Sequence, residues 1–165
     1  MQRPLDPAQL GDHLDRLYRA AWALCGSRQE AEDLVQETYA RILARPRLLR
    51  NEDDLGYLLQ ALRNTFLTQK RTERRRLRPG PLPEEFDLVA DPQAREPQAA
   101  LEAREVYDAV AALPADYRDV LVAVDVTGLS YKEAARALRI PEGTVMSRLY
   151  RARQQVVRRV EGGSA

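Results

Sequence analysis

A proline-rich stretch divides this 165-residue chain and limits its fold more than any other feature. Five of the ten prolines lie within residues 79–98, together with five acidic residues. Proline lacks an amide donor and disfavours helix in the residue before it, so this stretch indicates a linker. Because the patterns on both sides are helical, we predict an all-α fold with two small helical domains. Residues 1–78 and 99–165 form the domains, and residues 79–98 form a flexible, acidic, proline-rich linker.

The N-terminal half carries apolar residues every three to four positions, which is the spacing of amphipathic helices. A first helix is predicted over residues 7–25, after an aspartate cap and with a proline at its first position, and Gly26 is predicted to end it in a left-handed conformation. A capping box at Ser27 opens a second helix that ends before Pro46. A third helix starts within residues 51–54 and continues into an arginine-rich run. The three apolar stripes can bury one another, which gives a first domain of about 75 residues.

The C-terminal half ends in two short helical patterns that meet at a sharp corner. Ser130 and Glu133 form a second capping box, and residues 139–142 make a turn before another helix begins. This is the plan of a helix-turn-helix, whose second helix enters the major groove of DNA. The valine-rich run over residues 120–126 is also compatible with a strand, but its apolar spacing favours helix. No strand alternation appears elsewhere, so no strand is predicted.

Charge is balanced in total but not along the chain. The net charge is +1, with 26 basic and 25 acidic residues. Residues 63–79 carry a net charge of +6, residues 80–131 carry −8, and residues 132–159 carry +6. Two basic blocks predict two contacts with a polyanion, which the acidic stretch between them would avoid. For either block alone, a solvated helix face is the competing interpretation.

Composition disfavours most enzymes and any membrane role. One histidine, His13, and one cysteine, Cys25, are too few soft ligands for a zinc site, and no internal disulfide can form. A small hydrolase would need a nucleophile with an oriented base, but Ser27, Ser130 and Ser147 suit caps or a groove face instead. No membrane span or secretory signal is recognisable. We therefore expect a cytoplasmic protein that is not an enzyme, inserts into no membrane, and needs neither metal nor cofactor.

The second helix of the corner carries the predicted contacts with double-stranded DNA. Val145 and Leu149 face inward, which leaves two arginines facing outward, and a purely structural hairpin would not need them. Arg151 is the expected reader of a guanine edge, whereas Arg148 and Arg153 are expected to hold phosphates. The candidate residues are Thr144, Met146, Ser147, Arg148, Arg151 and Arg153.

These motifs resemble those of a known family. DVTGLSYKEAA at residues 125–135 and IPEGTVMSRL at residues 140–149 look like region four of the extracytoplasmic-function (ECF) sigma factors of bacteria. EAEDLVQET at residues 30–38 resembles the polymerase-binding helix of region two, and LRNTF at residues 62–66 resembles its promoter-opening segment. The resemblance runs from about residue 10 to residue 158, with both regions in the family's order.

The resemblance implies two further sets of contacts. Core RNA polymerase would be bound by acidic residues that pair with basic partner residues and by an apolar anchor. The minus-ten promoter element would be held by a basic run, with Asn64 reading a base extruded from the stack and the loop over residues 46–54 beside it. The polymerase set is Asp33, Leu34, Gln36 and Glu37, and the minus-ten set is Arg63, Asn64, Lys70, Arg71, Arg74 and Arg75. The resemblance also implies that the double-stranded DNA bound by the second corner helix is the minus-thirty-five promoter element.

Four positions depart from the family pattern. Thr68 stands where many members have Asp, and Tyr57 stands where Trp is frequent. Arg139 replaces a common turn glycine. Because a left-handed arginine costs about 1 kcal/mol, we expect a turn of different shape there. Met146 stands where Lys or Arg is common, and its side chain can touch a thymine methyl group but cannot hydrogen-bond a guanine.

Two functions are weighed. The first is a sigma factor that binds core RNA polymerase, directs it to specific promoters and assists promoter melting. Its partners would be core polymerase, promoter DNA and, as the family implies, an anti-sigma factor. The alternative is a helix-turn-helix transcriptional regulator that binds DNA without acting as a polymerase subunit. The first is preferred because two separate regional motifs occur in one chain.

Overall fold

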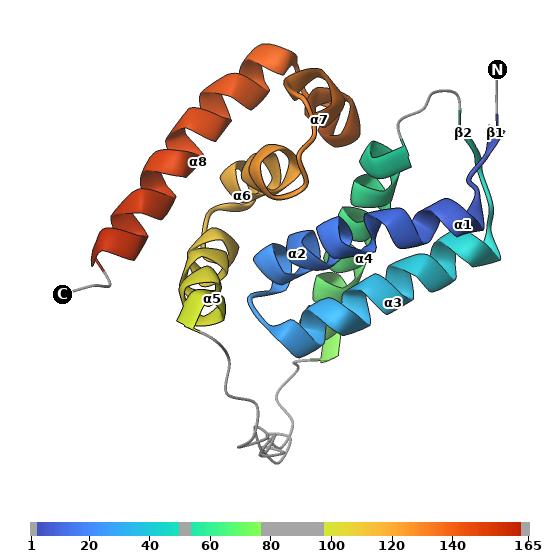
Figure 1. Ribbon diagram of the computed structural model, residues 1–165, viewed down its shortest axis with the longest axis horizontal. Coiled ribbons are helices and arrows are strands. Elements are labelled where there is room, and N and C mark those ends of the chain that lie inside the picture. The colour runs from blue at the N-terminus through green and yellow to red at the C-terminus, as the bar shows by residue number, and fades with distance from the viewer. Residues whose placement is uncertain (1–2, 50–53, 77–97, 163–165) are drawn as a thin grey trace.

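The computed structural model describes residues 3–49, 54–76 and 98–162, and these residues are mainly helical (Figure 1). The predicted all-α fold is therefore confirmed. The predicted linker over residues 79–98 lies outside the described residues, apart from Gln98. Part of the predicted loop over residues 46–54 does so too, as does most of the predicted start of the third helix.

The N-terminal half contains the three predicted helical segments and one short strand pair. The first segment is divided into α1 (Pro7–Leu10), the 3₁₀ turn η1 (Gly11–His13) and α2 (Leu14–Cys25). The second and third segments are α3 (Arg28–Ala44) and α4 (Asp54–Arg76). The strands β1 (Arg3–Pro4) and β2 (Leu48–Leu49), which were not predicted, pair antiparallel. The pair, with only two residues on each strand, is too short to produce a recognisable alternation.

Local capping fixes where these helices begin and end. The Asp6 carboxylate accepts a hydrogen bond from the Ala8 amide at 3.0 Å, so α1 starts at Pro7 as predicted. Gly26 ends α2 in the left-handed conformation with φ 73°. The Ser27 hydroxyl accepts from the Glu30 amide at 3.5 Å at the start of α3.

A long-range ion pair ties the N-terminus to α4. A guanidinium nitrogen of Arg3 lies 2.8 Å from a carboxylate oxygen of Asp54, the first residue of α4. The Asp54 side chain is almost fully buried, so this pair fixes the start of α4 beside the β1–β2 ribbon. Removing Arg3 would leave the buried Asp54 carboxylate unpaired, which is costly.

The C-terminal half is helical throughout its described length. Its elements are α5 (Gln98–Ala111), α6 (Ala115–Leu121), the π-helical turn η2 (Val122–Val126), α7 (Tyr131–Leu138) and α8 (Glu142–Gly162). The valine-rich run is thus helical, as its apolar spacing predicted. It widens into a π turn, where the Thr127 hydroxyl donates a hydrogen bond to the Val122 carbonyl at 2.7 Å.

The corner between α7 and α8 combines a confirmed prediction with a wrong one. The capping box is complete: the Glu133 amide donates to the Ser130 hydroxyl at 3.1 Å, and the Ser130 amide donates to Glu133 at 2.7 Å. Arg139, however, keeps the left-handed conformation with φ 57° and ψ 46°. Its amide bonds to Arg136 and the next amide, of Ile140, bonds to Ala135. These bonds satisfy the last carbonyls of α7 and offset the backbone cost.

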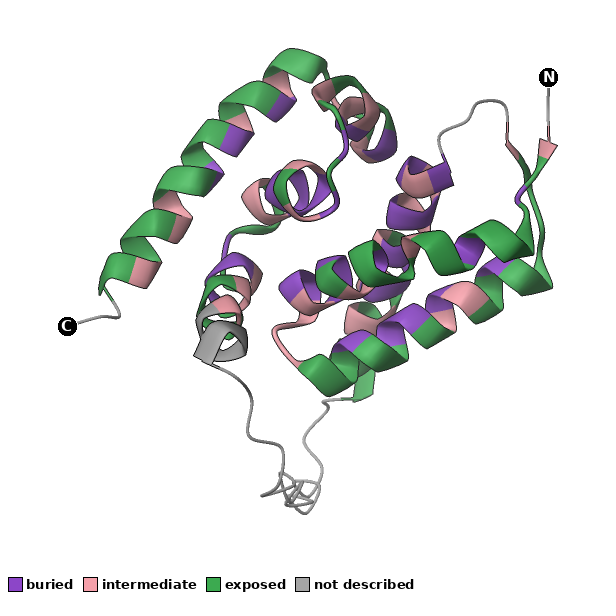
Figure 2. Ribbon diagram, viewed as in Figure 1, coloured by how far each residue is buried: buried purple, intermediate pink, exposed green. Residues whose placement is uncertain are grey.

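The two halves share one continuous hydrophobic core. Buried residues face inward along α2, α3 and α4 and again along α6, α7 and α8 (Figure 2). α2 packs against α3 and α4 on one side and against α5 and η2 on the other. The Trp22 ring of α2 lies on the Tyr107 ring of α5, with centroids 5.3 Å apart. The halves predicted as separate domains are therefore packed together, while their exact boundaries stay predictions.

Gly26 sits where α2 meets the C-terminal half, and this placement yields a stability prediction. We expect Gly26→Ala to destabilise the protein by about 1 kcal/mol or more, because an L side chain strains a positive φ. A Cβ atom at this position would also lie 3.3 Å from the Ala111 Cβ atom of α5. Urea unfolding measures the change.

Gly128→Ala is the matched control, because Gly128 has φ +82° but a Cβ atom added there would have nothing within 4 Å. In the control variant, the loss of unfolding free energy should come from backbone strain alone. Equal losses of unfolding free energy in the two variants would mean that the contact with α5 does not constrain Gly26.

Candidate nucleic-acid and polymerase interfaces

The predicted polymerase-binding residues lie on α3, but they do not share one environment. Asp33 and Gln36 are exposed on its surface. Glu37 is half-buried, with its carboxylate 2.8 Å from Arg41, and it also accepts a hydrogen bond from Gln69 of α4. Leu34 is 0% exposed and belongs to the core. Its predicted role as an apolar anchor is therefore wrong, because a partner cannot reach a side chain that holds α3 in the fold.

A hollow of about 340 Å³ lies between α3 and α4, beside this surface. Acidic and basic residues from both helices line it: Glu30, Asp33, Glu37 and Glu73 together with Arg41, Lys70 and Arg76. Cys25 lines it as well. Burial, and after it the charge of Glu30, raises the pKa of the Cys25 thiol from 9.0 to about 12. The thiol is therefore protonated at neutral pH and is a poor nucleophile.

The minus-ten candidates form two parallel stripes on α4. A helical repeat of 3.6 residues places residues 3, 4, 7 and 11 positions apart on about the same face. Asn64, Arg71 and Arg75 therefore share one stripe, and Arg63, Lys70 and Arg74 share the next. Four of these candidates are exposed, namely Asn64 and, nearer the C-terminal end of α4, Arg71, Arg74 and Arg75. Thr68 lies on the Asn64 stripe and donates to the Asn64 carbonyl at 2.9 Å.

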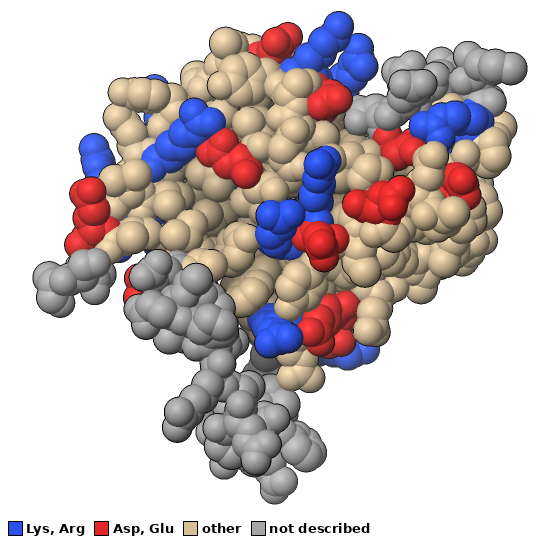
Figure 3. Space-filling model, in the orientation of Figure 1, with Lys and Arg blue, Asp and Glu red and all other residues tan. Residues whose placement is uncertain are grey.

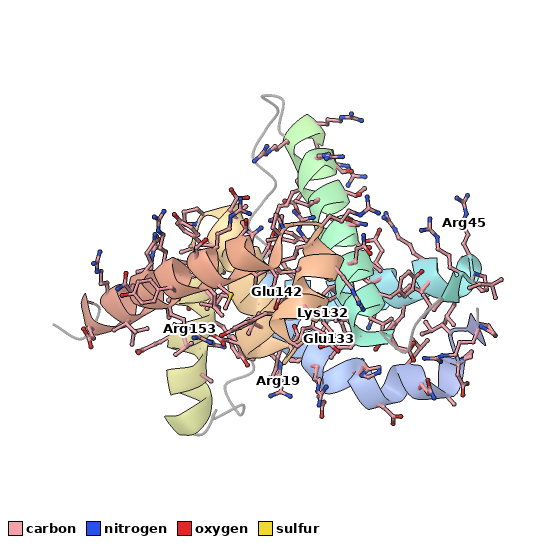
Figure 4. All side chains as sticks on the ribbon, turned by 90° about the horizontal axis from the view of Figure 1, so that it is seen from above. Arg19, Arg45, Lys132, Glu133, Glu142 and Arg153 are labelled. Atoms are coloured by element: carbon pink, nitrogen blue, oxygen red, sulfur yellow. The ribbon has the colours of Figure 1, made fainter. Side chains whose placement is uncertain are left out.

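Asn64 borders a pocket of about 310 Å³ that is rich in arginine. Among the residues that the structure describes, its lining includes no carboxylate, which favours an anionic ligand. Tyr57 supplies an aromatic ring, and Gln60 supplies a second amide. The arginines that line it are Arg41, Arg45, Arg47 and Arg139. Arg45 extends outward from the end of α3 (Figure 4). Sequence reasoning missed Arg41 and Arg45 and included Arg47 only as part of the loop over residues 46–54, although the close spacing of these arginines was a signal.

The outward face of α8 presents most of the predicted minus-thirty-five residues. Met146 is 51% exposed, Ser147 and Arg151 are exposed, and Thr144 and Arg148 are half-buried. Val145 and Leu149 are buried, which fixes this face outward as predicted. An Arg148 nitrogen lies 4.0 Å from Asp116. Within the described part of the chain, no carboxylate lies within ion-pair distance of Arg151.

Arg153 differs from the other arginines of α8. Its guanidinium donates to both carboxylate oxygens of Asp125, at 2.8 and 2.7 Å. Hydrogen bonding to Asp125 raises the pKa of Arg153 further above its usual range. The phosphate contact predicted for Arg153 stays untested, and this bidentate pair would first have to break or be shared. Figure 4 shows Arg153 apart from Glu142, which opens α8.

One face of the molecule carries no single-sign patch. Lysine and arginine side chains alternate with aspartate and glutamate side chains on the face seen in Figure 3. On this face, the basic blocks of the sequence therefore do not form a basic surface. Which cations have a carboxylate partner matters more than how many occur in each block.

Sequence reasoning missed the polar contacts between the two halves. Arg63 of α4 donates through Nε to Asp119 of α6 at 2.7 Å. The guanidinium carbon of Arg118 lies 5.0 Å from the centroid of the Phe66 ring. No local pattern marks Asp119 as different from Asp116, which is exposed on the same helix. The pairing depends on residues 56 positions apart, so only the tertiary structure reveals it.

Comparison with known families agrees with the two regions of the structure. A family model for Sigma-70 region 2 matches residues 10–76, and one for Sigma-70, region 4 matches residues 103–156. These two regions define the class of sigma-70 transcription initiation factors. The first region covers α2, α3 and α4, and the second covers most of α5 through α8.

Individual relatives specify the family. The chain is 36% identical over 147 residues to the ECF RNA polymerase sigma factor SigE of Mycolicibacterium smegmatis, covering 87% of this chain and 57% of that protein. It is 34% identical over 137 residues to the ECF RNA polymerase sigma factor EcfG of Rhodopseudomonas palustris, covering 82% of this chain and 74% of that protein. The chain therefore belongs to the ECF RNA polymerase sigma factors.

A solved structure shares the fold. The sigma factor RpoE from Bartonella quintana, in complex with the anti-sigma factor NepR, matches with a TM-score of 0.69 and 24% identity. The match covers 93% of this chain and 95% of that chain. Among the helices that the structure describes, none is long and apolar enough to cross a membrane.

Proposed function

We propose that this chain is a dissociable subunit of bacterial RNA polymerase that brings core enzyme to a subset of promoters and helps to open them. The observation that carries this proposal is the presence of both sigma regions in one chain, each with a helix that presents exposed polar and basic side chains. On α4 these are Asn64, Arg71, Arg74 and Arg75, and on α8 Arg151 is the clearest case. The subunit would act in the cytoplasm and would itself catalyse no reaction.

The polymerase contact is assigned to the exposed face of α3. Asp33 and Gln36 are free to meet a basic partner surface, and Glu37 is oriented beside them by Arg41. Electrostatic pairing at such an interface fixes register and speeds association. With Leu34 in the core, the apolar part of the contact must come from other residues.

The promoter contacts are assigned to α4 and α8. The pocket beside Asn64 combines an amide, an aromatic ring and several guanidinium groups, which suits an extruded base with its phosphates. The arginines farther along α4 would track the backbone of the separated strand. On α8, Arg151 would read a base edge in the major groove of the upstream element, and Ser147 lies one turn before it.

An anti-sigma factor is proposed as a further partner. The structural neighbour RpoE was solved with the anti-sigma factor NepR bound, and its fold covers both halves of this chain. The alternative function, a DNA-binding regulator that never joins polymerase, is not favoured, because it leaves the exposed acidic face of α3 without a role.

The polymerase assignment predicts a loss of core binding when the acidic face is removed. Replacing Asp33 and Glu37 together by alanine should weaken binding to core RNA polymerase by about tenfold or more. The fold should remain, because Asp33 is exposed and the half-buried Glu37 pairs with Arg41 on the same helix, and such pairs contribute only about 0–1 kcal/mol. Titration of labelled protein with core enzyme measures the affinity.

Glu32→Ala removes a similar charge from the same helix and is the matched control, since Glu32 is exposed and pairs only loosely with Arg28 at 3.6 Å. The control should bind core enzyme normally. If the double variant also binds normally, α3 is not the docking surface.

The minus-ten assignment predicts a defect that depends on strand separation. Asn64→Ala should reduce open-complex formation on duplex promoters while leaving closed-complex binding nearly unchanged, because the amide engages a base only after it leaves the stack. Arg74→Ala, which removes an exposed cation from the same helix, should instead weaken binding to duplex and premelted templates alike.

The comparison is made with reconstituted polymerase on a duplex template and on a template with a premelted bubble. If Asn64→Ala and Arg74→Ala behaved the same on both templates, a base-reading role for Asn64 would be excluded.

The assignment of Arg151 to a base contact in the minus-thirty-five element predicts that replacing it changes the promoter sequence preference. Arg151→Ala should relax selection at one or two base pairs, because a bidentate arginine–guanine contact provides about 1–3 kcal/mol of discrimination. Arg158→Ala, which removes an exposed cation two turns later, should leave the preference unchanged. Transcription from a promoter library with a randomised upstream element measures both, and an unaltered preference in Arg151→Ala would reassign the reader.

A further inference from the structure

Met146 presents an apolar side chain near the start of the second helix of the helix-turn-helix. It lies in the second turn of α8, which begins at Glu142, and it is 51% exposed. In this motif, residues near the start of the second helix contact the base edges of the major groove. Val145, directly before it, is buried, so the helix holds Met146 at the edge of its outward face. A flexible thioether therefore stands where a base edge would meet α8.

A second exposed apolar group lies one turn later on the same edge. Tyr150 follows Met146 by four residues, a spacing that places two side chains next to each other on a helix. It is 65% exposed, and its hydroxyl accepts a hydrogen bond from the Gln154 amide at 3.0 Å. The hydroxyl is thus engaged toward the following turn. Together, Met146 and Tyr150 give this edge of α8 an exposed apolar strip.

Two polar side chains close to Met146 in the helical repeat are already engaged. The Ser147 hydroxyl donates to the Thr144 carbonyl at 3.2 Å, so its hydrogen atom faces the backbone. Arg153 lies seven positions after Met146, which is two helical turns and nearly the same face. Its guanidinium is bound to both carboxylate oxygens of Asp125. A base at this edge of α8 would therefore meet the thioether of Met146 while both of these donors are occupied.

The major groove offers an apolar side chain one distinctive group. Each base pair presents hydrogen-bonding groups there, and thymine adds the methyl group on C5. Methionine has no hydrogen-bond donor, and its sulfur is a weak acceptor, so its main contribution is apolar contact. Cytosine that is methylated at C5 carries its methyl group at the same place on the pyrimidine ring. A side chain that recognises only this methyl group does not distinguish thymine from 5-methylcytosine.

We propose that Met146 reads the C5-methyl group of a pyrimidine in the minus-thirty-five element, and that 5-methylcytosine can replace thymine there. The proposal rests on the proposed function of α8 in binding that element. Removing one methyl group from water stabilises a contact by an amount that corresponds to about three- to fivefold in affinity. Promoter binding by this chain would therefore respond to cytosine methylation at one position of the element.

The first measurement locates the base that Met146 faces. Polymerase reconstituted from core enzyme and the full chain selects duplex promoters with a randomised upstream element. Wild type should select thymine, on either strand, at one position whose preference becomes flat in Met146→Ala, while the preference assigned to Arg151 remains. If Met146→Ala changes no position, or only one at which wild type prefers another base, the inference is wrong. Failure of wild type to select any upstream sequence would refute the proposed function of α8, and this inference with it.

The second measurement isolates the methyl group. Four duplexes carry thymine, deoxyuridine, cytosine or 5-methylcytosine at the located position, and the affinity of the same polymerase for each is measured before strand opening. Thymine and deoxyuridine differ only in the C5-methyl group, as do 5-methylcytosine and cytosine. With wild type, each methylated base should bind about three- to fivefold more tightly than its unmethylated partner. With Met146→Ala, the two members of each pair should bind equally.

Two results of this comparison would overturn the inference. A ratio near one for either pair in wild type would mean that the methyl group is not what Met146 recognises. A ratio that persists in Met146→Ala would mean that the methyl group acts through the shape of the DNA and not through this side chain.

Three variants test whether the contact is assigned to the correct residue. Val157→Ala is the matched control, because Val157 is 52% exposed and lies three turns later on the same edge, beyond the start of the helix. It should keep both ratios, and so should Met146→Leu, which retains an apolar side chain. Met146→Lys should lose them and select guanine, because its ammonium group can bond O6 and N7. Loss of the ratios in Val157→Ala or Met146→Leu, or their retention in Met146→Lys, would contradict the assignment.

Discussion

The rest of the structure depends on the packing of α2, which contacts the other helices of its own N-terminal half and also the C-terminal half. Ala20, Ala21 and Ala23 of this helix are fully buried, and side chains this small let neighbouring helices approach closely. α3 and α4 pack on α2 within the N-terminal half, and α5 and η2 pack on it from the C-terminal half. Any larger side chain at these alanines would have to displace one half or the other. The same helix therefore builds the region-two bundle and determines where region four rests.

Sequence patterns predicted the local structure well because its causes are local. The capping box at Ser130 and the glycine stop at Gly26 each depend on only a few neighbouring residues, and both occur as predicted. The contacts between halves have no such signal. Arg63 and Asp119 lie 56 residues apart, and each resembles other charged residues on its own helix. Leu34 shows the same limit, since helical spacing alone did not decide whether it faced the core or a partner.

Whether an arginine is paired with a carboxylate, more than the net charge of its basic block, distinguishes the arginines that are available to bind nucleic acid. The sequence groups Arg63 with Arg71, and Arg151 with Arg153, in two basic blocks of equal net charge. In the structure, one member of each pair is bound to a carboxylate, Arg63 to Asp119 and Arg153 to Asp125, while its neighbour is exposed. Both carboxylates belong to the acidic stretch between the blocks. That stretch thus contributes to folding by neutralising selected arginines, besides its expected effect of avoiding DNA.

The conformation of Arg139 connects the turn of the helix-turn-helix to the N-terminal half. A glycine at this turn would avoid the cost of a left-handed arginine, about 1–2 kcal/mol. The Arg136 and Ala135 carbonyls hold the turn in this geometry, whichever residue occupies it. What arginine adds is a guanidinium group at the pocket beside Asn64, on the other half of the chain. Backbone strain in the helix-turn-helix is thus accompanied by a contact with the N-terminal half, far from the face of α8 that is proposed to bind DNA.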